Sequence, residues 1–77
     1  NFMIYPNPTD GEINIASRQD MGTSTVSIYD INGRIVFTQN VEMTGTVNLQ
    51  AGTLKTGVYI IQIEGENYTH NSKLIIR

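Results

Sequence analysis

The chain has 77 residues, no cysteine and a formal net charge of −2. This length predicts one domain over residues 1–77, because domains usually run to about 100–150 residues, and no disulfide can support its core. Five scattered basic residues argue against a nucleic-acid partner, and apolar runs such as Val58 to Ile61 are far shorter than the roughly 20 residues of a membrane span, so we expect no membrane insertion.

The first part of the chain alternates short β-type segments with turn residues and shows no helical periodicity. An apolar segment at residues 2–5 ends at the Pro-Asn-Pro sequence of residues 6–8, where two prolines prevent ladder pairing. Gly11 completes a turn, since glycine adopts positive φ readily. The alternating sequence after it places Ile13 and Ile15 on one face of a strand with one wet side.

A β-hairpin is predicted in the next part of the chain. Val26 and Ile28 share one face of a strand, and Asp30-Ile31-Asn32-Gly33 follows it. An Asn-Gly pair between two apolar strands is among the strongest short-range hairpin signals. The returning strand, residues 34–41, has apolar residues at both parities, so its buried face stays open.

The last third of the chain predicts three more strands, at residues 46–49, 58–64 and 72–77. The second of these is the most apolar, and its apolar residues lie on both faces. We therefore expect Val58 and Ile60, as well as the residues between them, to be covered.

Together these segments predict an all-β fold, an immunoglobulin-like antiparallel β-sandwich of about seven strands. The period-2 placement of its apolar residues predicts a core that contains Ile13, Ile15, Val26, Ile28, Leu49, Tyr59, Ile61 and Leu74.

Residues that could carry chemistry are too few and too scattered for an active site. His70 is the only histidine, and without cysteine it has no partners for a zinc site. Asp10 and Glu12 flank a turn glycine, where an aspartate commonly bonds to the backbone. We therefore expect no catalytic residue, no cofactor, no metal and no enzyme activity.

Four segments, at residues 5–11, 26–36, 54–63 and 73–77, together resemble a known family. In this order and spacing they are similar to the type A C-terminal sorting domain of the type IX secretion system of Bacteroidetes-type bacteria. The likeness covers the chain from Tyr5 to Arg77. Its recognition or signature motif consists of Pro6, Asn7, Pro8, Gly11, Tyr29, Asp30, Gly33, Arg34, Gly57, Tyr59, Lys73 and Arg77.

The resemblance implies a role in protein export. Members of the family lie at the C-terminus of a cargo protein that enters the periplasm by the general secretory route. The outer-membrane translocon then recognises the folded domain, and sortase-like attachment machinery often removes it. The implied partners are this machinery and an N-terminally fused cargo, and the implied location is the periplasm in transit, then the medium or the outer-membrane surface. A first residue other than methionine also leads us to expect a piece of a longer protein.

Two other functions are compatible with a small sandwich. A carbohydrate-binding or adhesive module would need an exposed aromatic platform, whereas this chain has no tryptophan and four tyrosines. A structural spacer between domains would continue beyond Arg77 in its parent protein.

Two expectations concern the last strands. Residues 72–77, at a sheet edge, are expected to offer unpaired backbone groups to a receptor by strand addition. Gly57, directly before the most apolar strand, is expected to need a backbone conformation that a β-branched residue resists.

Overall fold

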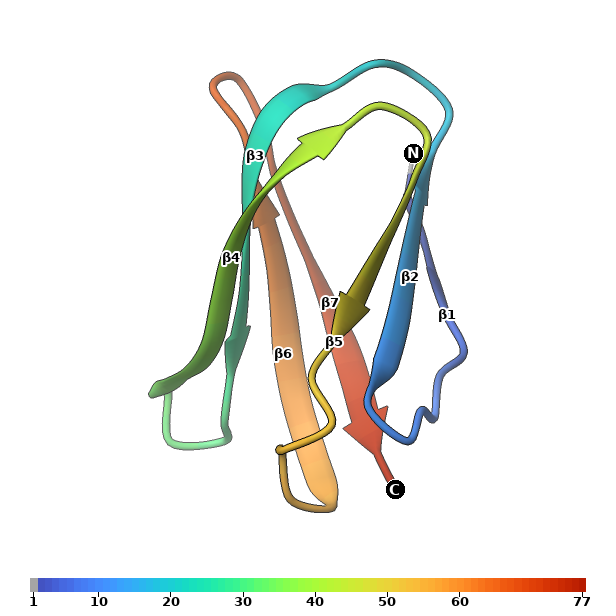
Figure 1. Cartoon of the computed structure of the whole chain (residues 1–77). Helices are drawn as coiled ribbons and strands as arrows, with labels where there is room; N and C mark the ends of the chain where they lie inside the picture. Colours follow the sequence, from blue (N-terminus) through green and yellow to red (C-terminus); the bar gives the residue numbers. More distant parts are fainter. Residues whose placement is uncertain (1) are drawn as a thin grey trace.

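Seven β-strands in two antiparallel sheets make up the computed structural model, which describes residues 2–77 (Figure 1). The three-stranded sheet has the order β1-β2-β5 and contains β1 (Phe2–Tyr5), β2 (Glu12–Ser17) and β5 (Thr46–Gln50). The four-stranded sheet has the order β4-β3-β6-β7 and contains β3 (Gly22–Tyr29), β4 (Ile35–Met43), β6 (Gly57–Glu64) and β7 (Thr69–Ile76). This architecture confirms the predicted all-β sandwich. No helix among the described residues is long and apolar enough to cross a membrane.

The core lies between the two sheets and is built from the inward faces of six strands. All eight residues predicted for it are buried, Tyr59 at 8% exposure being the most accessible of them. Because side chains alternate across a strand, every second residue of β2, β3 and β6 reaches this layer. The structure adds five buried residues that the sequence analysis did not name: Val41, Met43, Ala51, Ile63 and Ile76.

The predicted hairpin joins β3 to β4 and is confirmed. Asp30 N–H donates to the Arg34 carbonyl at 2.9 Å, and Gly33 N–H donates to the Asp30 carbonyl at 3.0 Å. Gly33 has a φ of +82°, which is the left-handed conformation that a three-residue hairpin loop needs at its last position. The glycine of the Asn-Gly pair therefore directs the chain back into the sheet.

A β-bulge explains why apolar residues of β4 fall on both parities. Tyr29 pairs with Ile35 and Ile28 pairs with Phe37, so Val36 is an extra residue without a register partner. A bulge shifts the alternation by one residue. Ile35 consequently lies on the outer face, while Phe37 packs against the core.

The expectation that β6 is covered on both sides is wrong. Val58 and Ile60 are 46% and 43% exposed, whereas Ile61 and Ile63 are fully buried. The reason is that the fold has only two layers (Figure 1). One face of the four-stranded sheet packs against the other sheet, whereas no further layer within residues 2–77 covers its outer face.

Candidate functional site

The twelve signature residues come from distant parts of the sequence and gather at one end of the sandwich, the lower end in Figure 1. β1, β3 and β7 end there, and β2, β4 and β6 begin there. The loop of residues 6–11, the hairpin of residues 30–34 and the end of the chain therefore lie at the same end. We call this region, formed by residues 5–11, 29–35, 51–59 and 73–77, the signature end.

The segment before β2 lies along the outer edge of β7. The Asn7 side-chain N–H donates to the Lys73 carbonyl at 2.9 Å, and its Oδ1 accepts from the Ile75 N–H at 3.0 Å. Two residues later, Thr9 N–H donates to the Ile75 carbonyl and Arg77 N–H donates to the Thr9 carbonyl, both at 2.9 Å. The outward backbone groups of β7 from the Lys73 carbonyl to the Arg77 N–H are therefore paired.

This pairing corrects the strand-addition expectation for residues 72–77. In an edge strand, the backbone groups of alternate residues point away from the sheet, and here these are the groups of Lys73, Ile75 and Arg77. Asn7 and Thr9 occupy them from within the same chain. The end of β7 therefore offers a receptor its side chains rather than a free backbone edge.

Thr9 and Gly11 explain why the loop takes this path. The Thr9 hydroxyl is fully buried, donates to the Glu12 carbonyl and accepts from the Gly11 N–H at 3.1 Å. Gly11 has a φ of +125°, and a Cβ on it would lie 2.5 Å from the Cα of Gly52. The turn therefore requires glycine at position 11. Thr9 was not among the predicted site residues, and its position two residues before a turn glycine was the available signal.

The expectation for Gly57 is wrong. Its φ lies outside the left-handed region, and a Cβ there would meet only a ring carbon of Tyr59, at 3.8 Å. Tyr59 itself points inward, where its hydroxyl donates to the Lys55 carbonyl at 2.6 Å. These two signature residues thus belong to the packing of the loop onto β6 rather than to an exposed surface.

Two ion pairs are found among residues 2–77, and both lie at the signature end. Asp30 Oδ2 accepts from Arg34 Nε, and Asp10 Oδ1 accepts from Arg77 Nε, each at 3.0 Å. Asp30 Oδ1 also accepts from the backbone N–H groups of Asn32 and Arg34. The pKa of Asp30 is lowered, mainly because the Arg34 backbone N–H donates to its charged carboxylate. Lys73 projects outward and has no ion-pair partner among the described residues.

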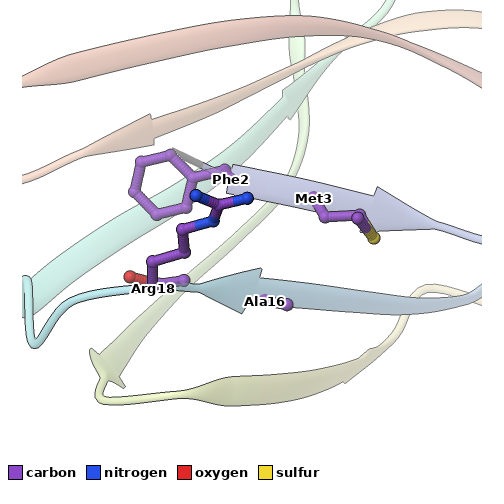
Figure 2. Close-up of a pocket in the computed structure, with 5 residues that line it drawn as sticks. Phe2, Met3, Ala16 and Arg18 are labelled. Atoms are coloured by element: carbon purple, nitrogen blue, oxygen red, sulfur yellow. The ribbon is translucent and has the colours of Figure 1, made fainter.

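The structure also contains a shallow hollow of about 210 Å³ at the opposite end, between β1 and β2 (Figure 2). Phe2, Met3, Ala16, Ser17 and Arg18 line it, and the Arg18 side chain extends toward the Phe2 ring. Its walls are mainly apolar, and they contain no pair of acid and base residues. Among residues 2–77 no three His, Asp or Glu side chains group as metal ligands.

Comparison with known proteins identifies a family whose match covers the fold and the signature end. The family model described as "Secretion system C-terminal sorting domain" matches residues 3–77. The chain is also similar to an endo-acting ulvan lyase of Formosa agariphila, with 34% identity over 77 residues. That alignment covers 96% of this chain and 14% of the relative, so the chain spans about one seventh of the length of that protein.

Proposed function

The chain belongs to the family of secretion system C-terminal sorting domains, and on this premise we propose that it carries a cargo protein, fused on its N-terminal side, through the type IX translocon. The domain is a sorting signal of type IX secretion, and its family is not catalytic. Its function is therefore to direct export, to the medium or to the cell surface.

The observation that supports this proposal is the gathering of the signature residues at one end of the sandwich. Asn7, Lys73 and Arg77 lie up to 70 positions apart in the chain, yet the loop of residues 6–11 and the end of β7 form one hydrogen-bonded unit. A receptor that recognises this unit would recognise it only in the folded domain. The proposed signal is therefore a folded surface at the signature end rather than a linear peptide.

The proposed path has further steps. The cargo would pass through the periplasm before the translocon takes it up, residues 1–77 would act as a single domain of type A, and sortase-like machinery would remove that domain after export. A sorting signal that is removed after export needs neither a cofactor nor a deep cavity.

A reporter fusion tests the sorting function. The 77 residues are placed behind a reporter that carries a general signal peptide, in a bacterium with a type IX system. We expect the reporter outside the cells, and in the periplasm of the same strain without its outer-membrane translocon. If the reporter stays periplasmic while an established sorting domain exports it, the proposed function is wrong.

The removal step has its own measurement. Mass spectrometry of the exported reporter should show a product shorter by about the 8.6 kDa of this domain. An exported product that retains the full domain would contradict removal, but it would leave the sorting function intact.

A further inference from the structure

The outer face of the four-stranded sheet is divided into an apolar half and a polar half. Next to the signature end, Tyr29 pairs with Ile35 on one side and with Ile60 on the other. Val58 pairs with Ile75 in the neighbouring row. Paired side chains on one face lie about 5 Å apart, so these five form one continuous surface. We call it the apolar half-face.

The other half of the same face carries polar side chains. Its two rows are formed by Thr38, Ser27, Gln62 and Asn71, and by Asn40, Thr25, Glu64 and Thr69. The contrast shows that the outer face is not apolar throughout. Apolar side chains are concentrated beside the signature residues.

Exposure of these apolar side chains is substantial. Ile35, Val58 and Ile60 are 57%, 46% and 43% exposed. Contiguous exposed apolar surface on a small protein commonly marks an interaction site. Core packing does not require these side chains, since β6 already buries Tyr59 and Ile61 on its inner face.

The charges around the apolar half-face are asymmetric. Lys73 pairs with Ile60 in the register and thus lies at the edge of the half-face without an ion-pair partner among the described residues. The nearby carboxylates of Asp10 and Asp30 are already bound to Arg77 and Arg34. The charged side chains at the opposite end, where β2, β4 and β6 end, are mainly acidic: Asp20, Glu42, Glu64 and Glu66, with Arg18 as the basic one.

We propose that the apolar half-face is the docking surface for a partner protein that presents an apolar centre and a carboxylate opposite Lys73. This inference rests on the proposed function, because the partner is then the receptor of the export machinery. Apolar contact supplies the affinity, and the unpaired ammonium group of Lys73 selects an acidic residue at the rim.

The same features disfavour two other occupants. In a symmetric dimer the apolar half-face would meet itself, and the rows of the half-face contain no carboxylate that could pair with Lys73 at its rim. Recognition of an anionic membrane typically uses clusters of four to eight basic residues, whereas the half-face offers Lys73 alone.

The test uses the reporter fusion with two variants of the half-face. Val58→Thr with Ile60→Thr keeps β-branched side chains on an exposed face, so the strand should persist. Each change removes apolar contact at the centre of the surface, and we expect export to fall about tenfold or more. Lys73→Glu reverses the rim charge and should lower export as well. Melting curves of the purified 77-residue variants check that each one folds.

Two matched controls lie elsewhere on the molecule. Met3→Thr changes an exposed apolar residue of the three-stranded sheet, which is 65% exposed, and Arg18→Glu reverses a charge at the opposite end. Both variants should be exported at the normal level. Export loss in the controls equal to that in the half-face variants would overturn the inference.

The outcomes separate this inference from the proposed function. If the unchanged fusion is not exported, the sorting function itself fails. If it is exported and the folded half-face variants are exported equally well, the docking surface is wrong while the sorting function stands. If Val58→Thr with Ile60→Thr does not fold, Lys73→Glu and the single variant Ile35→Thr decide in its place.

Binding measurements on the purified 77-residue chain identify the occupant. We expect a monomer in sedimentation, and no co-sedimentation with phosphatidylglycerol vesicles. A dimer that the double variant abolishes, or vesicle binding that it abolishes, would overturn the proposal of a receptor protein in favour of self-association or a membrane.

Discussion

Asn7 and Ile75 are 68 positions apart in the chain, and the backbone N–H of Ile75 donates to the side-chain Oδ1 of Asn7 at 3.0 Å. The Asn7 side chain also donates to the Lys73 carbonyl. Its amide thus makes the two hydrogen bonds with the edge of β7 that the backbone of a neighbouring strand would otherwise make. Covered edges resist unwanted strand pairing. The contact therefore both closes the sandwich and fixes the end of the chain beside the loop of residues 6–11.

Removal of the Asn7 amide should destabilise the fold moderately. Asn7→Ala deletes two hydrogen bonds, each with a net contribution of about 1 kcal/mol, so the free energy of unfolding should fall by about 1–2 kcal/mol. Urea unfolding measures the change. Asn71→Ala is the control. Asn71 lies on β7, the strand that Asn7 contacts, and its side chain makes no hydrogen bond within the described residues. Equal losses in both variants would contradict the role assigned to Asn7.

Gly11 and Gly57 should differ sharply in their tolerance of a side chain. Gly11→Ala places a Cβ against the Gly52 backbone at a φ of +125°, and strain of this kind costs about 1–3 kcal/mol before the backbone moves. Gly57→Ala meets nothing closer than 3.8 Å and should change stability by less than about 0.5 kcal/mol. Thermal unfolding of both variants compares them. A larger loss for Gly57→Ala would contradict the backbone geometry at these two positions.

The contribution of Asp30 to stability should depend on pH. Its pKa in the folded chain lies below the ordinary value of 3.8, mainly because the Arg34 backbone N–H binds the charged carboxylate. A depressed carboxyl pKa gives stability that is present above the unfolded value and is lost as the pH falls through the folded value. The stability difference between the unchanged chain and Asp30→Asn should therefore be constant from pH 7 to about 5 and shrink below 3.8. A stability difference between the two chains that stays the same well below pH 3.8 would contradict this role of the Asp30 carboxylate.

Two neighbouring isoleucines of β6 test which face is the core. Ile61 is fully buried, so Ile61→Ala should cost about 2–5 kcal/mol and threatens the fold of so small a domain. Ile60 is 43% exposed, and Ile60→Ala should cost clearly less, about 1 kcal/mol. Chemical unfolding of the two variants gives the ranking. Similar losses would mean that the outer face is covered after all.

Lys73 and Arg77 should matter for export more than for folding. Arg77 keeps its backbone bond to Thr9 in any variant, and its exposed ion pair with Asp10 contributes about 0.2–1 kcal/mol. The double variant Lys73→Ala with Arg77→Ala should thus melt within a few degrees of the unchanged chain, while export of the reporter falls. Normal export of the folded double variant would remove both side chains from the signal, although the sorting function would remain.

The sequence alone determined that the chain forms short strands, which faces of β2 and β3 are buried, and where the main hairpin lies. Ile13 with Ile15, and Val26 with Ile28, alternate with polar residues, and that local pattern is enough to assign a half-buried strand. Gly33 similarly marks its turn by its own conformational freedom. The resemblance of the four segments also identified the family without any structure, because their order is a property of the chain.

Tertiary structure alone decided which faces and edges stay free. Val58 and Ile60 have the composition of covered residues, and their exposure depends on the number of layers, which no local pattern encodes. The edge of β7 is paired because the loop of residues 6–11 returns to it from the other end of the sequence. A glycine is required where two backbones meet, as at Gly11 against Gly52, and that approach is a long-range contact. Periodicity determines what each segment can bury, whereas the packing of distant segments determines what remains accessible to a partner.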